Sequence, residues 1–374
     1  MRKTLTVFMV AALAATGIGR AATKADANTI HIALTAPITG DYAEYGTNFK
    51  RSVEMGIEEI NAAGGVLGKK FVLSVGDSKG DPKESVNLAE KWISDPSVFA
   101  QIGDFTSTCC MASQPIYNRA GMIQLSPTAS HTKFAAGSKW SFSIVGTQAM
   151  EQPFMAKLAV QHLKAKNIAI LYINNDWGAD TQKFFKENFE QMGGKIVAVE
   201  SFFQGEKDFT AVLIKLRQAK PDALYIATMF NDCATISQQR EKMGWNLPTL
   251  GPSSLYSPQL IALGGTSVNG LYSNVSFFTK DPDKRIQAYV TGFQKRYNDT
   301  PNFHAALAYD SIYLLADAIK RAGSLDREKV RETLAATKDF KGLTGSITFT
   351  PNRDAVKSYK YIQVVNGEFQ LPKI

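Results

Sequence analysis

The sequence predicts an α/β protein built from two doubly wound lobes, each a parallel sheet with helices on both faces. Its 374 residues exceed the usual size of a single hydrophobic core, which favours two domains. Short apolar, β-branched runs alternate with helical patterns, as is typical of parallel strands joined by helical crossovers. The alternation begins near residue 29 and restarts beyond residue 147, so we expect one sheet in each part.

The first series contains four expected strands with helices between them. The strands are TIHIALTAP (29–37), FVLSVGD (71–77), FAQIG (99–103) and MIQLSP (122–127). The helix expected at 43–63 is followed by Gly64-Gly65, a usual helix end. The next helix is expected to open at Pro82, because proline is favoured at the first helical position.

The second series and the C-terminal third complete the two lobes. Strands are expected at 167–174, 195–203, 223–229, 249–253 and 270–278, with helices at 151–166, 179–194, 209–220 and 232–244. Helices at 304–323 and 326–338 precede SITFTP (346–351) and KYIQVVNGEFQ (360–370), two strand segments that need a sheet to join. We therefore expect crossings near residues 147, 277 and 350, which would form a hinge. The N-terminal lobe is then 28–147 with 277–350, and the C-terminal lobe 148–276 with 351–374.

Residues 1–27 have the order of a secretory signal peptide. Arg2 and Lys3 precede an apolar run that ends near Ile18, and small residues follow. The run is too short to span a bilayer comfortably, so a membrane anchor is the weaker alternative. Cleavage is expected after Ala27 or near Ala21.

Composition and charge exclude several classes of function. Apolar residues make up 44% and charged residues 20% of the chain, as in ordinary globular proteins. The formal net charge is +8, and no basic stripe is interleaved with aromatic residues, so nucleic acid is not an expected partner. Cys109, Cys110 and Cys233 do not make a disulfide framework, and the four histidines lack metal-ligand spacing. We expect no cofactor and no metal.

Two runs of small hydroxyl residues follow neighbouring strands of the first series. Thr106-Ser107-Thr108 comes after FAQIG, and Ser126–Ser130 begins at the end of MIQL. Ligands of open parallel sheets bind beyond the carboxyl ends of strands, and free amides at a helix N-terminus suit a carboxylate or another small anion. The alternative is that Ser107 or Thr108 only caps the next helix. These residues alone leave a binding site and a helix cap equally open.

Two aromatic residues occupy equivalent crossovers. Tyr45 lies in the loop expected after the first strand, and Trp177 lies in the equivalent loop of the second series. Either one alone is more typical of ordinary packing. Their matched placement favours a pair that encloses a ligand from both lobes.

The motif GDSKG (76–80) matches the G-x-S-x-G of serine hydrolases and makes a secreted hydrolase a remote alternative. A nucleophile elbow needs its helix to begin directly after the serine. Here three residues separate Ser78 from the helix expected at Pro82, so we do not expect an enzyme.

Six motifs occur in order along the chain. They are TAPITGDYAEYG with INAAGGVLGKK, GDSKGDP, IGDFTSTCC ending in LSPTAS, NNDWGAD, GEKDFTAVLIKL, and LGPSS. Each is weak alone, but their order and spacing resemble the type I periplasmic binding proteins of the leucine/isoleucine/valine-binding family, the solute receptors of ABC importers. The resemblance covers essentially the whole mature chain and implies a cleft between two lobes that closes by a hinge motion.

The resemblance also implies which residues hold the ligand. Its carboxylate site matches Ser107 after the third strand and, after Ser126-Pro127, the residues Thr128, Ala129 and Ser130. Its aromatic wall matches Tyr45, Trp177 and Phe230.

Two departures from the family pattern bear on the ligand. Amino-acid binders commonly hold the ligand's ammonium with a glutamate in a Gly-Pro-Glu turn, and Ser253 stands at that position. Because an unpaired ammonium in a closed cleft is costly, either another acid such as Asp232 serves, or the ligand has no α-amine. The disulfide of leucine-type members is also absent, since Gly80 and Thr106 stand at its positions.

The resemblance further implies the setting of the protein. We expect a periplasmic monomer that delivers a small carboxylate, an amino acid or an aromatic acid, to the membrane permease of an ABC importer. A sensor with the same fold and ligand remains an open alternative.

Overall fold

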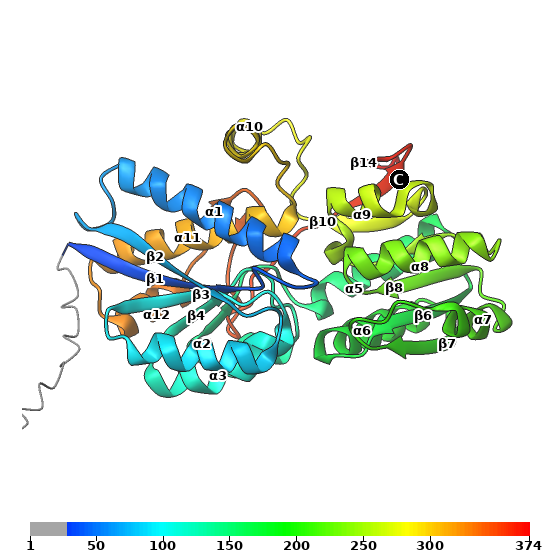
Figure 1. Ribbon diagram of the computed structural model, residues 1–374, viewed down its shortest axis with the longest axis horizontal. Coiled ribbons are helices and arrows are strands. Elements are labelled where there is room, and N and C mark those ends of the chain that lie inside the picture. Colours follow the sequence, from blue (N-terminus) through cyan, green and yellow to red (C-terminus); the bar gives the residue numbers. More distant parts are fainter. Residues whose placement is uncertain (1–27) are drawn as a thin grey trace, which may run out of the picture.

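The structure, a computed structural model, describes residues 28–374, so the signal peptide expected at 1–27 lies outside the described residues. Two sheets lie one after the other along the long axis, each between layers of helices (Figure 1). This arrangement confirms the α/β class with two doubly wound sheets. Among residues 28–374, no helix has the length and apolar character needed to cross a membrane.

The first sheet has five parallel strands in the order β2-β1-β3-β4-β5. They are β1 (Thr29–Ala36), β2 (Lys70–Asp77), β3 (Val98–Gly103), β4 (Ile123–Ser126) and β5 (Ser141–Ser143). The helices of this part are α1 (Ala43–Ala62), α2 (Pro82–Ser94), α3 (Ser107–Ala120) and α4 (Lys133–Ala136). Helix α1 covers one face, and α2 and α3 lie together on the other (Figure 1). Successive residues of β1 therefore enter different cores, Leu34 with Phe49 of α1 and Ala33 with Trp92 of α2.

The second sheet has seven strands in the order β14-β13-β10-β9-β8-β6-β7. They are β6 (Asn167–Ile173), β7 (Lys195–Phe202), β8 (Ala223–Ala227), β9 (Thr249–Leu250), β10 (Tyr272–Val275), β13 (Lys360–Val365) and β14 (Glu368–Gln370). Strands β6 to β10 are parallel, whereas β13 and β14 add antiparallel at one edge. The last strands of the chain thus return to the second sheet.

Helices cover both faces of the second sheet. They are α5 (Gln148–Lys157), the π-helical turn η1 (Leu158–His162), α6 (Asp176–Gln191), α7 (Thr210–Gln218), α8 (Phe230–Lys242), the 3-10 turns η2 (Ser253–Leu255) and η3 (Gly265–Val268), and α9 (Pro258–Gly264). Ile170 of β6 packs in one cluster with Phe185 of α6, and the next residue, Leu171, belongs to the cluster that contains Ile236 of α8.

Three helices follow β10: α10 (Lys284–Tyr297), α11 (Phe303–Ala322) and α12 (Arg327–Ala335). Helix α11 packs against α1 and so brings the chain back to the first sheet (Figure 1). Strands β11 (Phe340–Gly342) and β12 (Gly345–Ile347) pair only with each other. The SITFTP segment, which needed a sheet to join, therefore pairs in a two-stranded sheet of its own rather than in either of the two larger sheets. Asp310 of α11 accepts hydrogen bonds from the amides of Leu343 and Thr344 at 2.7 and 2.9 Å, which holds this hairpin against α11 instead.

The helix ends follow ordinary capping chemistry. Helix α2 opens at Pro82 as expected, and Asp81 before it accepts a hydrogen bond from the amide of Lys83 at 2.6 Å. The cap of α3 is Thr106, whose Oγ1 accepts from the amide of Cys109 at 3.2 Å. The alternative that Ser107 or Thr108 caps this helix is therefore wrong, since both lie inside its first turn.

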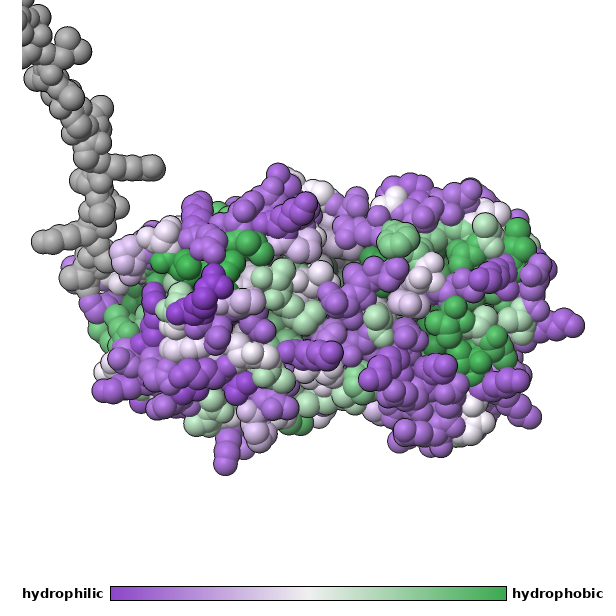
Figure 2. All heavy atoms as spheres, turned by 90° about the horizontal axis from the view of Figure 1, so that it is seen from below, coloured by the Kyte–Doolittle hydropathy of each residue, from purple (hydrophilic) through white to green (hydrophobic). Residues whose placement is uncertain are grey.

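The face of the molecule in Figure 2 is mainly hydrophilic, with hydrophobic residues in separate areas on both halves. Single exposed hydrophobic side chains, such as Phe203 and Ile214, are normal on soluble proteins. The candidate site lies instead between the two halves.

Candidate functional site

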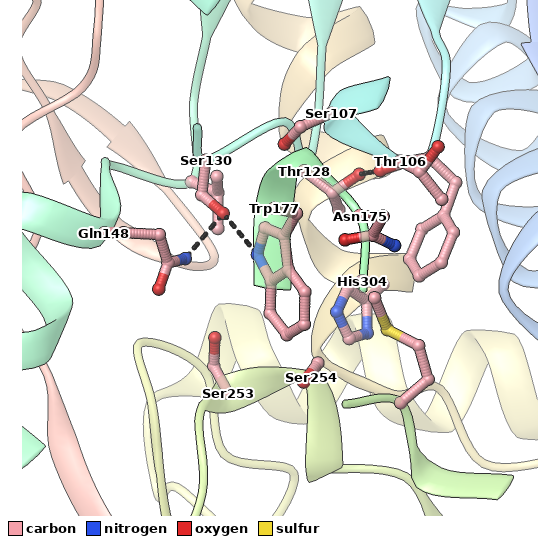
Figure 3. A pocket seen from close by; sticks show the side chains of 13 residues that line it. Thr106, Ser107, Thr128, Ser130, Gln148, Asn175, Trp177, Ser253, Ser254 and His304 are labelled. Carbon is pink, nitrogen blue, oxygen red and sulfur yellow. Dashed lines mark hydrogen bonds between the residues drawn. The ribbon is translucent and has the colours of Figure 1, made fainter. Parts of the chain in front are cut away.

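A cleft lies where the carboxyl ends of the strands in both sheets face one another, which is the usual place for a ligand in parallel α/β sheets. Its lining residues are Phe105, Thr106, Ser107, Thr128, Ser130, Val145, Gln148, Asn175, Trp177, Met229, Ser253, Ser254 and His304 (Figure 3). The space between these side chains is about 440 Å³, including the part open to solvent. The cleft is therefore narrow and suits a small ligand.

The first sheet contributes the N-terminus of α3. Cys110 makes the first hydrogen bond back along this helix, to the carbonyl of Thr106 at 3.0 Å, so the amides of Ser107 and Thr108 precede the helical ladder. The hydroxyl oxygen of Ser107 accepts from the amide of His131 at 3.2 Å. That bond leaves the hydroxyl proton of Ser107 free to be donated. A helix N-terminus with such a donor attracts an anion.

Ser130 is the second hydroxyl donor of the cleft. Its Oγ accepts from the indole N–H of Trp177 at 3.0 Å and from the side-chain Nε2 of Gln148 at 2.7 Å (Figure 3). A hydroxyl oxygen has two lone pairs and one proton. With both lone pairs engaged, Ser130 can offer a ligand only its proton, which suits a carboxylate oxygen.

Thr128 and Ala129 have other partners. The hydroxyl of Thr128 lines the cleft but donates to the carbonyl of Phe105 at 2.7 Å. Ala129 is fully buried outside the lining, and its amide donates to Oγ of Ser126 at 2.9 Å. The structure thus places Thr128 at the predicted site, whereas Ala129 supports the turn behind it.

Trp177 lines the cleft, and Tyr45 does not. Both lie in the first turn of a helix, α6 and α1, so their placement in loops was wrong. Helix α1 begins at Ala43 as expected and already includes Tyr45, whereas α6 begins at Asp176, three residues before the expected start at 179. Tyr45 is fully buried behind Phe105, with ring centroids 4.2 Å apart. The cleft wall at this position is therefore Phe105, which Tyr45 supports.

The hydroxyl of Tyr45 joins the two halves of the molecule. It donates to the carbonyl of Ser254 at 3.0 Å and accepts from the amide of Phe230 at 3.2 Å. The ring of Phe230 packs on Tyr45, 5.1 Å between centroids, and lies outside the lining. Phe230 therefore contributes to the seam between the halves rather than to the cleft wall.

No aspartate, glutamate, lysine or arginine of the described residues lines the cleft. Asp232 lies outside the lining, accepts from the hydroxyl of Thr228 at 2.8 Å, and has a pKa raised by burial. Ser253 does line the cleft, at the position where the resemblance expects a glutamate. The ammonium partner proposed at Asp232 is therefore not at the cleft surface.

A buried acid that the sequence did not single out lies behind the lining. Glu151 of α5 accepts from the amide of Ser253 at 2.7 Å, from Nδ2 of Asn274 at 2.8 Å and from Nε2 of Gln148 at 3.2 Å. These three donors occupy both carboxylate oxygens. Glu151 thus orients Gln148 and Ser253, and it gave no sequence signal because it lies within an ordinary helical pattern.

Sequence reasoning also missed several lining residues. They are Phe105, Val145, Gln148, Asn175, Met229, Ser254 and His304. Four of them lie within two residues of a predicted residue, so position beside a strand end was the available signal. Val145 and Gln148 follow β5, a strand that the sequence pattern did not show. His304 comes from the start of α11, and only the packing of α11 against α1 brings it there.

Ser78 has no features of a nucleophile. It is fully buried, and its Oγ accepts from the amide of Gly80 at 3.4 Å. None of the four histidines, all within the described residues, hydrogen-bonds to Ser78.

The three cysteines form no disulfide and are buried, and burial raises the pKa of Cys109 and of Cys233 to about 12.

Comparison with known proteins agrees with this geometry. The family model described as periplasmic binding protein matches residues 29–368. A leucine-, isoleucine-, valine-, threonine- and alanine-binding protein of Pseudomonas aeruginosa is 29% identical over 348 residues, 92% of each chain. The leucine-binding protein LivK of Thermotoga maritima superposes with a TM-score of 0.87 at 29% identity, over 92% of this chain and 97% of that one.

A further solved structure, LivJ of Streptococcus pneumoniae in complex with isoleucine, superposes with a TM-score of 0.86 at 28% identity and covers 91% of this chain and 98% of that one. The resemblance and the fold expected from the sequence are therefore confirmed. The chain belongs to the periplasmic binding protein family and is a solute-binding protein of the kind that serves ABC transporters.

Proposed function

We propose that this protein is the periplasmic receptor of an ABC importer and that it binds a small carboxylic acid in the cleft. The observation that carries the proposal is the hydrogen bonding of Ser130, whose two lone pairs are engaged and whose proton alone is left. The hydroxyl of Ser107 and the first amides of α3 supply further donors. These hydrogen-bond donors lie together, and no carboxylate of the protein at the cleft surface competes for them. They therefore suit a single carboxylate of a ligand.

The lobes of the proposed receptor are 28–147 with 277–350 and 148–276 with 351–374, and the three crossings act as its hinge. Hydrogen bonds that span the two sheets support a closed form. Trp177 donates to Ser130, and Tyr45 donates to the carbonyl of Ser254. We propose that these bonds form when the lobes close over the ligand and break when it is released to the permease.

A carboxylate is present in two classes of ligand, the amino acids and the carboxylic acids that have no α-amine. The relatives named above favour a branched-chain amino acid. The absence of an acidic side chain from the cleft lining of the described residues favours a carboxylate without an α-amine, such as an aromatic acid.

The proposed setting follows from the family. Residues 1–27 direct export and are then removed. The mature chain acts as a monomer, performs no catalysis and hands its ligand to a membrane permease. The alternative is a sensor that presents the same closed form to a membrane receptor. Deleting the permease genes distinguishes the two roles, because growth on the ligand requires these genes only if the protein serves an importer.

A thermal-shift screen tests the proposal. Leucine, isoleucine, valine, benzoate and 4-hydroxybenzoate are compared, each beside its primary amide. We expect at least one acid to raise the unfolding midpoint, since a ligand bound only by the folded state stabilises it, while the matching amide does not. An amide that stabilises as strongly as its acid would contradict carboxylate recognition.

A further inference from the structure

We propose that His304 forms a second subsite of the cleft, which binds a hydroxyl group on a carboxylic acid that has no ammonium group. This inference rests on the proposed function, because it takes the carboxylate to be held by Ser107 and Ser130. It adds a residue that determines specificity for a second polar group of the ligand.

The imidazole of His304 is buried with an unsatisfied polar atom. The side chain is 4% exposed, lines the cleft, and its Nδ1 has no hydrogen-bond partner among the described residues. Its ring contacts are edge-on with Tyr45 at 4.9 Å and Phe105 at 5.7 Å, and tilted with Phe303 at 5.3 Å. Buried polar atoms in native proteins nearly always have partners, so a partner supplied by the ligand accounts for this one.

The ring is neutral at every physiological pH. Burial lowers its pKa to about 3, and the N-terminal end of a helix also disfavours a positive charge. A neutral imidazole offers one N–H donor and one acceptor nitrogen. A hydroxyl group, which can donate and accept, matches either tautomer, whereas a second carboxylate would lack a positive partner here.

The position of His304 is fixed by the first turn of α11. Asn302 caps this helix, with Oδ1 accepting from the amide of Ala305 at 2.8 Å. Nδ2 of Asn302 donates to Glu44 of α1 at 2.8 Å. The helix start that carries His304 is thereby tied to the helix that carries Tyr45, so the ring is held in place for a ligand.

The side chain of Asn175 lies on the same side of the cleft as His304 and offers a second hydrogen-bond donor (Figure 3). Oδ1 of Asn175 accepts from the amide of Gly178 at 2.8 Å, and its Nδ2 donates to no partner among the residues described. In Figure 3, Asn175 and His304 lie on one side of Trp177, and Ser130 and Gln148 lie on the other. The cleft thus offers polar groups at two separate places.

The described side chains provide no carboxylate at the cleft surface to pair with a ligand ammonium. A ligand ammonium needs acceptors, preferably a carboxylate. Glu151 already accepts from three donors behind the lining. Asp232 lies outside the lining. The ligand class is therefore a hydroxy-substituted carboxylic acid without an amine.

Calorimetry on three matched sets of probes tests the proposal with the full mature chain. The sets are 4-hydroxybenzoate with benzoate, 2-hydroxy-4-methylpentanoate with 4-methylpentanoate, and leucine with 4-methylpentanoate. We expect at least one hydroxy acid to bind about three- to tenfold more tightly than its partner, the effect of one neutral hydrogen bond. We expect leucine to bind at least about tenfold more weakly than 4-methylpentanoate.

The variant His304→Phe keeps an aromatic ring and removes both nitrogens. The hydroxyl preference should fall to about onefold in His304→Phe and should persist in His162→Phe, a matched control whose histidine bonds to Tyr272 away from the cleft. His304→Gln, which keeps a donor and an acceptor, should restore part of the preference and serves if His304→Phe fails to fold.

Three results would overturn the inference: a hydroxyl preference that is absent in the wild type, a preference that is unchanged in His304→Phe, or tighter binding of leucine than of 4-methylpentanoate. Failure of the proposed function is a different result, in which none of the acids binds.

Discussion

The indole N–H of Trp177 donates a hydrogen bond to the hydroxyl of Ser130 at 3.0 Å. Trp177 belongs to the first turn of α6 beside the second sheet, and Ser130 follows β4 of the first sheet. The bond therefore joins the two halves of the molecule and, by filling a lone pair of Ser130, also fixes the direction of its proton. In the proposed function, closure of the cleft and presentation of a donor to the ligand therefore depend on the same contact.

Replacing Trp177 by phenylalanine tests this coupling. The variant keeps an apolar ring and removes the donor, so we expect ligand affinity to fall by about 0.5 to 1.5 kcal/mol, the value of one hydrogen bond. Trp92→Phe is the matched control, because it removes an indole bond to Thr35, also 3.0 Å long, within the first lobe. Calorimetry should find weaker binding only in the first variant; equal losses in both would show that the effect is general destabilisation.

A second contact between the halves lies at Asp180 of α6. Its carboxylate accepts from the amide of Thr132 at 2.9 Å and from the hydroxyl of Thr132 at 3.2 Å. In the proposed hinge motion these bonds form only when the lobes are together, so Asp180→Ala should speed ligand dissociation by about three- to thirtyfold. Stopped-flow release measures this rate.

The control for this experiment is Asp222→Ala. Asp222 also accepts from backbone amides, those of Lys166 and Asn167, but entirely within the second half. Asp222→Ala should release ligand at the wild-type rate. If it released ligand as fast as Asp180→Ala, the proposal that the contact between Asp180 and Thr132 slows release by holding the lobes together would be contradicted.

Glu44 makes stability depend on pH. Burial raises the pKa of Glu44 to about 7. Hydrogen bonds from Asn302 and Ser257 lower this pKa, but their effect is smaller than that of burial. The folded state therefore binds a proton between the unfolded pKa near 4.5 and pH 7, and the unfolded state does not, so the free energy of unfolding falls as pH rises through this window. The loss should be on the order of 2 to 4 kcal/mol and complete above about pH 8.

Glu44→Gln should remove that part of the pH dependence. Urea denaturation at pH 5, 6, 7 and 8 gives the free energy of unfolding of the variant and the wild type. Glu54→Gln, on the same helix with a side chain 32% exposed, is the control and should follow the wild type. Parallel curves for Glu44→Gln and wild type would contradict the assignment.

The buried cysteines should be unreactive. Because burial raises the pKa of Cys109 and of Cys233 to about 12, and that of Cys110 well above its usual range, few thiolates form at pH 8. We expect a thiol-specific dye to label the native protein slowly and the urea-unfolded protein fully, at all three cysteines. Rapid labelling of the native state would show that this part of α3 or α8 opens.

The order of elements could be predicted because strand and helix periodicities are local. The hydroxyl runs were recognised for the same reason, since Ser107 and Ser130 directly follow strands whose ends share one edge of a sheet. Pattern alone did not show that Thr106 takes the capping role from Ser107, because all three residues of that run are suited to it.

The remaining features depend on contacts between distant segments. Tyr45 was expected at the cleft, yet Phe105 covers it, a fact of packing between α1 and the loop after β3. His304 could not be predicted because its place depends on α11 returning to α1. Glu151 reads as one more polar residue of a helix, and only the fold brings Ser253 and Asn274 to its carboxylate.

The most direct test of carboxylate binding is calorimetric titration of Ser107→Ala with the acid that stabilises the wild type most. Thr108→Ala is the control, since its hydroxyl lies one residue further along the same helical turn and outside the cleft lining. The account predicts that Ser107→Ala loses about 1 to 3 kcal/mol of binding free energy, the penalty for a lost bond to a charged group, and that Thr108→Ala loses none. Unchanged affinity in Ser107→Ala would contradict it.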